Sequence, residues 1–465
     1  MRPFRAPLGF LAALLIVLAA CAHYPLNRAL DPVPAAPSYE FPREANGTNT
    51  NGLFVCLVFS GGGTRAAALS YGVLERLRAT PILWEGRDKS LLDEVDCISS
   101  VSGGSFTSAY YGLFPDKTFT DFRAGFLETD VEGALMTRVL SPSNWFRLAS
   151  PTFSRIDLAA EYYGESLFAG KTFRDLGAGG RRPFIILNAT NMATGERFEF
   201  TQPEFNVLGS DLGPYPVARA VAASSAFPFL LSPVSLKNHP APPEVKFSRE
   251  MRLAEGDFYD NRRRYQWAVN RTRYGDAVAY PYLHLMDGGL ADNIGLRPIE
   301  DAFRRGFIRS LMNGGEIQKL VFIIVNARTE GQDGISRQEK APGLKSVAMK
   351  TATVAMDNYS FDTIELIKEL RDQRRQTQGV LRAFREKCPG AGAQPRLASE
   401  VEPFVVNIDF AAIKDPERRR YFLGLPTSFK LSREQVEKLI SVGGELLAAD
   451  PEFQELMGQI GKPGR

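Results

Sequence analysis

The sequence is poor in histidine and cysteine, and both shortages narrow the chemistry that the chain can perform. Only three of its 465 residues are histidines, His23, His239 and His284, and only four are cysteines. No Cys/His spacing is typical of a zinc site, so we expect neither a metal nor another cofactor. Cys56 and Cys97 fall in apolar strand-like runs, where a free thiol behaves as a small hydrophobic side chain, and Cys388 falls in a polar loop. We therefore expect no disulfide framework.

An excess of one charge is also lacking. Lys and Arg number 56 against 53 Asp and Glu, and the formal net charge is +3. Nothing in this balance indicates a nucleic-acid partner. The 44% hydrophobic and 23% charged composition is typical of a folded globular protein, and the length suffices for one large domain or two ordinary ones. There is no internal repeat.

The N-terminal residues have the pattern of a secretory signal. Arg2 and Arg5 give a positive start, and the apolar run from Phe10 to Ala20 is too short to span a bilayer comfortably. The ending Leu18-Ala19-Ala20-Cys21 resembles a bacterial lipoprotein signal, with an ordinary signal peptide or a short membrane anchor as alternatives. The resemblance implies that residues 1–20 are removed, that Cys21 is acylated and anchors the protein in the membrane, and that Ala22 after it directs the protein to the outer membrane, facing the periplasm.

A glycine loop follows the first apolar run of the mature chain. The run 53–59 is continuous, as in a central parallel strand, and leads into Ser60-Gly61-Gly62-Gly63-Thr64-Arg65 before a helical pattern. Such a strand, loop and helix gather backbone N–H groups into an anion-binding site, which suits an oxyanion hole. Gly61-x-Gly63-x-x-Ala66 also fits a dinucleotide fingerprint, but the second strand ends in a serine turn where that fingerprint needs an acid. A third interpretation is a glycine turn needed only for tight packing.

The serine turn has the pattern of a nucleophile elbow. A short apolar strand leads into Ser100-Val101-Ser102-Gly103-Gly104, and a helical segment follows. An elbow needs small residues on both sides of its serine, and Ser100 and Gly104 are both small. The usual pattern has glycine where Ser100 stands, so a serine-rich turn whose hydroxyls only cap a helix remains an alternative. Since the two strands are expected to be parallel, the loop and the turn should lie side by side at the carboxyl edge of the sheet.

A hydrolytic serine needs a base, and no histidine is well placed to serve as one. His23 lies in the N-terminal segment, His239 in a proline-rich loop, and His284 three residues before Asp287 on one strand, so that the two side chains face opposite ways. Asp287 ends its strand at a double-glycine turn, which should place it at the same carboxyl edge as Ser102. We therefore expect Asp287 to be the base, and Asp292 to be a cap or turn residue.

These motifs together resemble the signatures of the patatin-like phospholipases. The resemblance rests on the loop 60–65, the serine turn and Asp287-Gly288-Gly289, in this order, and residues 222–228 are similar to a helix ending of that family. It spans about residues 53–330. It implies an α/β fold of three layers with a mostly parallel central sheet, and a Ser-Asp dyad that needs no histidine. Two positions depart from the family: Ser60 stands where Asp or Asn is frequent, and Ser100 replaces the first glycine of the elbow.

The resemblance also implies a role for each residue that matches a motif position. Ser102 is the nucleophile, Asp287 is the base, and the loop Gly61, Gly62 and Gly63, supported by Arg65, is the oxyanion hole. The implied activity is hydrolysis of lipid acyl esters of the phospholipid or lysophospholipid kind. The alternative is a catalytically weak envelope lipoprotein that binds lipid or acts as a scaffold, and the two departures leave room for it. The alternative role for Arg65 is that of a cation at the start of a helix, paired with an acidic side chain on the surface.

The remaining chain predicts the domain organisation. After the signal (1–20) we expect a proline-rich extended tether (21–51), a catalytic domain (52–330) and a C-terminal extension packed on the same domain (331–465). Residues 113–180 should form a helical insertion over the catalytic edge. Strands are expected at 184–190, 197–201, 319–326 and 404–408, and helices at 217–227, 344–374 and 432–447. Residues 235–282 are the least regular; their arginines and aromatics around 262–274 indicate a solvated loop or a contact with anionic head groups.

Overall fold

The computed structural model describes residues 22–31, 38–228, 230–330, 339–387, 401 and 403–461. The signal segment, Cys21 and Cys388 lie outside these residues, so the expectations for them stay predictions. Within the described part of the chain, no helix combines the length and apolar character that a membrane span requires.

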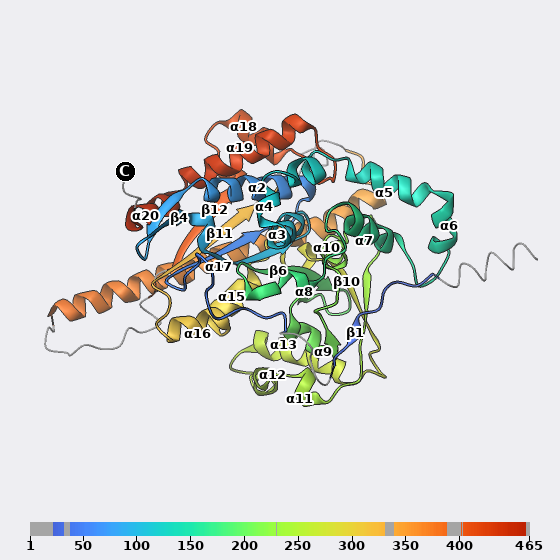
Figure 1. Ribbon diagram of the computed structural model, residues 1–465, viewed down its shortest axis with the longest axis horizontal. Helices are drawn as coiled ribbons and strands as arrows, with labels where there is room; N and C mark the ends of the chain where they lie inside the picture. The colour runs from blue at the N-terminus through green and yellow to red at the C-terminus, as the bar shows by residue number, and fades with distance from the viewer. Residues whose placement is uncertain are drawn as a thin grey trace, which may run out of the picture.

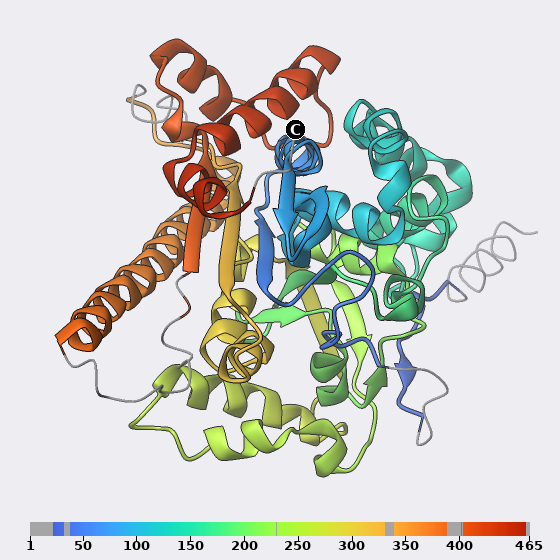
Figure 2. The same cartoon turned by 60° about the vertical axis from the view of Figure 1, so that its left-hand side comes forward.

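A mixed, mostly parallel eight-stranded sheet forms the centre of the molecule (Figures 1 and 2), as the fold prediction requires. Its order is β12-β11-β2-β5-β6-β10-β9, with β7 beside β6. The strands are β2 Leu53–Phe59, β5 Val95–Val101, β6 Phe184–Asn191, β7 Arg197–Glu199, β9 Val234–Lys237, β10 Tyr282–Asp287, β11 Lys319–Asn326 and β12 Pro403–Asp409. The strands from β12 to β6 run parallel, whereas β7, β10 and β9 pair antiparallel. Every residue of β2, β5 and β6 is buried, which explains their apolar sequences.

Helices cover both faces of this sheet (Figure 1). The principal ones are α2 Gly63–Arg78, α3 Gly103–Leu113 and α19 Arg433–Ala449 on one face, and α15 Arg297–Arg304 and α17 Leu344–Lys387 on the other. Others are α10 Val217–Ser224, α14 Gly289–Asp292, α16 Phe307–Asn313, α18 Pro416–Leu423 and α20 Pro451–Gln459. The expected three layers are therefore present. The predicted late helices and strands are confirmed, with α17 extending further than its apolar pattern indicated.

The segment 113–180 is helical, as predicted. Its helices are α4 Pro115–Thr118, α5 Val131–Leu140, α6 Pro142–Leu148, α7 Arg155–Ser166 and α8 Phe173–Leu176. Of these, α5, α6 and α7 lie together at one end of the molecule (Figure 1), whereas α4 and α8 lie nearer its centre.

The N-terminal segment lies against the domain wherever the structure describes it. Strand β1 (Arg28–Ala29) pairs with β8 (Ser210–Asp211), which follows α9 (Gln202–Val207). Tyr39 is buried, and its hydroxyl donates to the carbonyl of Ile185 at 2.9 Å. These residues are mainly extended, but the domain holds them in place.

Cys56 and Cys97 form a disulfide, so the expectation of free thiols was wrong. The two cysteines are direct partners on the parallel strands β2 and β5, and their Cα atoms are 4.7 Å apart, within the range that a disulfide spans. The sequence did not reveal this pair, because spacing along the chain does not give the register of two strands whose cysteines are 41 residues apart.

The expectation of an irregular loop over 235–282 was also wrong. This segment holds α11 Pro243–Lys246, α12 Arg249–Ala254 and α13 Arg262–Thr272. Elsewhere in the chain, β3 (Pro81–Trp84) and β4 (Arg87–Ser90) form a separate two-stranded hairpin. The arginines of α13 have partners within the protein. Arg262 stacks on the ring of Phe258 at 3.9 Å, and Arg263 and Arg264 form ion pairs with Glu300 and Asp257. The segment is thus a small helical layer, and Arg262 and Arg263 on it are exposed.

Candidate active site

The glycine loop and the serine turn meet at the carboxyl ends of β2 and β5, as predicted. The register pairs Phe59, the last residue before the glycine loop, with Ser100, the first residue of the serine turn. A Cβ atom on Gly103 would lie 2.1 Å from the carbonyl oxygen of Gly63. Only glycine fits at that position, because the backbones of the two motifs are in contact there.

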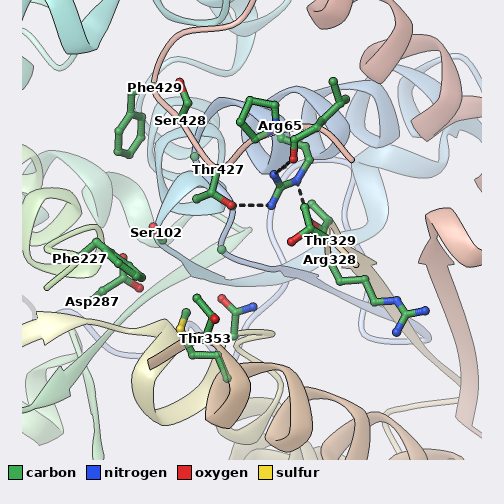
Figure 3. Close-up of a pocket in the computed structure, with 18 of the residues that line it drawn as sticks. Arg65, Ser102, Phe227, Asp287, Arg328, Thr329, Thr353, Thr427, Ser428 and Phe429 are labelled. Carbon is green, nitrogen blue, oxygen red and sulfur yellow. Dashed lines mark hydrogen bonds between the residues drawn. The ribbon is translucent and has the colours of Figure 1, made fainter. Parts of the chain in front are cut away.

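Ser102 has the backbone geometry expected of a nucleophile elbow. It lies between β5 and α3 with φ 50° and ψ −118°, a conformation that residues with a side chain rarely adopt. Its N–H donates to the hydroxyl of Ser224 at 2.9 Å, which holds the turn from the side of α10. The strained turn directs the Ser102 side chain into a cavity at the edge of the sheet (Figure 3).

Ser100 is accommodated by a cluster of buried hydroxyl groups. Its Oγ lies 2.6 Å from that of Ser108 and accepts a bond from Ser105 at 3.3 Å. Ser105 in turn lies 2.9 Å from Ser224, which donates to the carbonyl of Asn188 at 2.6 Å. The departure from glycine therefore adds a hydrogen bond beneath the turn instead of an unpaired buried hydroxyl.

Ser60 also has a role in the loop. Its N–H donates to Val325 at 3.1 Å, and its Oγ accepts the N–H of Ala327 at 2.9 Å. These bonds join the start of the glycine loop to the end of β11.

Asp287 lies beside Ser102, but not for the reason given by the sequence. Strand β10 runs antiparallel to β6, so Asp287 is not at a shared carboxyl edge of parallel strands. Instead, Asp287 pairs with Ala189 on one side of β6, while Val101, just before Ser102, pairs with Asn188 on the other side. The two side chains thus reach the same level of β6 from its two flanks and line the same cavity, and the Ser102 hydroxyl is close enough to lower the pKa of Asp287.

The environment of Asp287 suits a group that exchanges a proton near neutral pH. The residue is 2% exposed, and its Oδ1 accepts the N–H of Gly289 at 2.8 Å. Burial raises the pKa of Asp287 to about 7, although the hydrogen bond from Gly289 and the nearby Ser102 hydroxyl act in the opposite direction. Asp292 instead accepts the N–H of Arg297 at 2.8 Å, as expected of a turn residue.

The histidines lie away from this pair. His284 is exposed, and its Nδ1 lies 2.8 Å from the hydroxyl of Ser235, so it faces away from Asp287 as predicted. The Nε2 of His239 is bonded to the carbonyl of Asn27 at 2.9 Å. None of the histidines lines the cavity that contains Ser102.

The free amides of the glycine loop are those of Gly62 and Gly63. The N–H of Gly61 already donates to the carbonyl of Asn293 at 2.9 Å. Gly62 and Gly63 have φ 140° and 59°, and in the described part of the chain their N–H groups have no hydrogen-bond partner. They stand at the N-terminus of α2, where the helix dipole favours negative charge.

A cavity of about 500 Å³ opens over these groups (Figure 3). Its apolar lining includes Phe227, Leu230, Met356, Leu423, Leu425 and Phe429. This volume falls in the range of small-molecule sites, and the apolar wall suits a hydrocarbon chain. Among the described residues, no group of three or more His, Cys, Asp or Glu side chains could hold a metal ion.

The family model for patatin-like phospholipases matches residues 57–302, more than half of the chain. The chain belongs to this family. All three motifs, with Ser102 and Asp287, fall within the matched range. The comparison with curated protein sequences found no match.

Solved structures with a related shape include human GIVD cytosolic phospholipase A2. One such structure is 13% identical with a TM-score of 0.44, and the match covers 88% of this chain and 62% of that chain. A second, of the same enzyme in complex with methyl gamma-linolenyl fluorophosphonate, is 13% identical with a TM-score of 0.40 and coverages of 88% and 58%. The chain thus spans less than two thirds of these proteins.

Part of the active-site wall lies beyond the patatin-like match. Arg65 is buried, and its guanidinium donates to the carbonyls of Ala327 at 2.9 Å and Leu425 at 2.7 Å and to the hydroxyl of Thr427 at 3.0 Å (Figure 3). These bonds join the start of α2 to residues beyond the matched range. The N–H of Thr64 also donates to Ser428 at 2.9 Å. We call residues 425–429 the C-terminal strap; sequence reasoning missed it, because no local motif marks it.

Proposed function

We propose that this patatin-like protein is a serine acyl-ester hydrolase that acts on phospholipids or lysophospholipids, with Ser102 as nucleophile and Asp287 as base. The observation that carries the proposal is a serine in a strained backbone conformation that shares one cavity with a buried carboxyl group whose pKa is about 7. Hydroxyl activation requires such a base within hydrogen-bond reach.

The reaction follows from the geometry in two steps. Asp287 takes the hydroxyl proton while the Ser102 Oγ bonds to the ester carbonyl carbon, and the N–H groups of Gly62 and Gly63 bind the oxyanion of the tetrahedral intermediate. The C–O bond to the alcohol breaks as Asp287 returns the proton to the leaving oxygen, which leaves an acyl group on Ser102. Water then attacks this ester with Asp287 again as base, the bond from the carbonyl carbon to Oγ breaks as Asp287 returns the proton to Ser102, and the fatty acid is released.

The alternative function is that of a catalytically weak protein that binds lipid or acts as a scaffold. The hydrogen bonds of Ser60 and Ser100 favour the enzyme, because they keep loop and turn ordered despite both departures. A fluorophosphonate probe should label the wild-type protein and not Ser102→Ala, since only an activated serine reacts. Absence of labelling in folded wild-type protein would favour the scaffold. A screen against phospholipids, lysophospholipids and neutral esters would then define the substrate.

We also propose that the protein is a lipoprotein of the cell envelope, anchored through acylated Cys21 in the outer membrane. The disulfide Cys56–Cys97 supports an oxidising compartment. Cys21→Ala should abolish incorporation of labelled palmitate and leave unprocessed or unanchored protein. Continued incorporation by this variant would refute the lipoprotein assignment.

A further inference from the structure

The hairpin of α5 and α6 presents an apolar surface that the described protein does not cover. Met136 is 58% exposed, Leu140 62%, Trp145 57% and Phe146 43%. In the described structure α5 buries only Val131, and α6 buries no residue. A helix that packs against protein buries an apolar stripe, so the apolar side chains of this hairpin need another partner.

The first described residue of the chain is bonded to the segment that leaves this hairpin. The carbonyl of Ala22 accepts the hydroxyls of Ser150 at 2.5 Å and Thr152 at 2.9 Å, and the N–H of Tyr24 donates to Thr152 at 2.8 Å. Ser150 lies two residues after α6. Cys21 is covalently joined to Ala22, so a lipid on Cys21 begins next to the hairpin.

The same hairpin contributes to the wall of the active-site cavity. Glu132, in the first turn of α5, lines the cavity and accepts the N–H of Phe429 at 2.9 Å. Asp130, the N-cap of α5, pairs with Lys430 at 2.5 Å. Leu230 also lines the cavity and is 60% exposed, which gives its mouth an apolar rim. Any external surface that binds the hairpin is thus close to the mouth of the cavity that contains Ser102.

Both arginines of the hairpin have acidic partners within the protein. Arg138 forms an ion pair with Glu165, and Arg147 forms one with Glu161. The exposed side chains are therefore mainly apolar, with a tryptophan and a phenylalanine of the kind that favours the membrane interface. This combination suits insertion between lipid head groups and does not require anionic lipid.

We propose that the α5–α6 hairpin is the lipid-docking surface of the protein. Met136, Leu140, Trp145 and Phe146 insert into the interfacial layer of the membrane that carries the Cys21 anchor, and the cavity with Ser102 faces that membrane. The proposal rests on the proposed function for its anchor and substrate. The docking itself is tested without catalysis.

The direct test uses Trp145 as a depth probe. The full chain carries Ser102→Ala, so that no lipid is consumed, and Trp84→Phe and Trp267→Phe, so that Trp145 is the last of the three tryptophans. It is reconstituted in neutral phosphatidylcholine vesicles with bromine at defined acyl positions. We expect shallow bromines to quench Trp145 strongly, and equally at low and high salt. The fold of the variant is checked by circular dichroism.

A matched control places a tryptophan on another surface. In the same background, Trp145→Phe is combined with Tyr259→Trp; Tyr259 is 93% exposed. It precedes α13, which lies at the bottom of Figure 1, whereas α6 lies at the right-hand side. We expect no quenching there. Quenching of Trp145 no stronger than that of the control would overturn the proposal.

A second experiment leaves Trp84 and Trp267 unchanged. Leu140→Gln with Trp145→Gln should slow hydrolysis of vesicle phospholipid by about fivefold or more, because the cavity loses its approach to the lipid. Hydrolysis of a dispersed short-chain ester should stay within about twofold, since both side chains are exposed. Val278→Gln, at a residue that is 91% exposed, is the control and should leave both rates unchanged.

The outcomes separate docking from catalysis. Equal loss of both rates, or no loss on vesicles, would overturn the docking surface. A parent protein that hydrolyses neither substrate would refute the proposed function, while the quenching experiment would still decide docking. A detergent-solubilised dimer that Leu140→Gln dissociates, together with unquenched Trp145, would assign the hairpin to a second copy of the chain and overturn the proposal.

Discussion

Ser102 and Asp287 line the same cavity although the strands that lead to them are not neighbours. Strand β6 lies between β5 and β10, and the two side chains meet over the level of Ala189. The approach of the two side chains across β6 depends on Gly288, since a Cβ atom at that position would lie 2.3 Å from the carbonyl oxygen of Asn188. The pair is therefore built by the tertiary arrangement of three strands.

The first prediction is that Ser102 and Asp287 act as one unit. Ser102→Ala and Asp287→Asn should each lower esterase turnover by roughly 10³-fold or more, and the double variant should be little worse than either. Steady-state kinetics on a soluble ester measures this. His239→Ala and His284→Ala are the controls and should stay within about tenfold of the wild type. A folded histidine variant as inactive as Ser102→Ala would contradict the dyad.

The second prediction concerns the pH profile. Because Asp287 must be ionised to accept the proton and its pKa is about 7, kcat/KM should rise with pH through neutrality and level off above it. At pH 5 we expect a value about 100-fold below the plateau, since each pH unit below the pKa lowers the ionised fraction about tenfold. The measurement is kcat/KM for an ester without ionisable groups. A flat profile from pH 5 to pH 9 would exclude Asp287 as the base.

The third prediction concerns stability. Burial raises the pKa of Asp287 from 3.8 in the reference state to about 7 in the folded protein. The folded state therefore binds the proton more tightly, and stability is lost as pH rises from about 4 to about 7. Asp287→Asn removes this loss and should raise the free energy of unfolding at pH 8 by on the order of 2–4 kcal/mol.

Thermal unfolding of both proteins across pH tests this. The difference in Tm should shrink toward pH 4, where wild-type Asp287 is neutral in the folded state and half-protonated in the unfolded state. A variant that is less stable than the wild type at pH 8 would show that the carboxylate holds the Asp287–Gly289 turn.

The fourth prediction concerns the disulfide. Replacing Cys56 and Cys97 together by alanine should lower the free energy of unfolding by roughly 3–4 kcal/mol, because the bond closes a loop of 41 residues. Denaturant unfolding with and without reductant measures this, and reductant should affect only the wild type. Cys388→Ser is the control. Alkylation of Cys56 and Cys97 in denatured, unreduced protein would show that the bond is absent.

The fifth prediction concerns Arg65 and the C-terminal strap. Arg65→Ala removes three hydrogen bonds from a buried site and should lower stability by about 2–4 kcal/mol. With the strap released from the oxyanion loop, kcat/KM should fall by about 10-fold to 100-fold. Arg65→Lys should recover only part of this, since one ammonium cannot reproduce the planar fork.

Arg328→Ala is the matched control for Arg65. Its side chain also lines the cavity but is 40% exposed, so we expect a much smaller loss of stability. Limited proteolysis should cut the strap faster only in the Arg65 variants. Unchanged proteolysis and kcat/KM in Arg65→Ala would show that the strap is held by other contacts.

The sequence by itself determined the local parts of this protein. The apolar runs at 53–59 and 184–190 predict buried parallel strands, because a strand covered on both faces has no polar side. The turn at Ser102 and the glycine loop were predictable for a related reason. Small residues at fixed spacing are required wherever a chain turns sharply against a neighbouring backbone. A few adjacent residues of the sequence are therefore enough to predict such a turn.

Only the tertiary structure decided the contacts between distant segments. The register that joins Cys56 to Cys97, the antiparallel direction of β10 and the strap held by Arg65 depend on how strands and loops pack. Arg65 and Leu425 are 360 residues apart, and no periodicity or spacing links them. A local pattern reports which face of an element is buried, but it carries no information on which distant segment covers that face. For this reason Asp287 was predicted at the right place from the wrong strand direction.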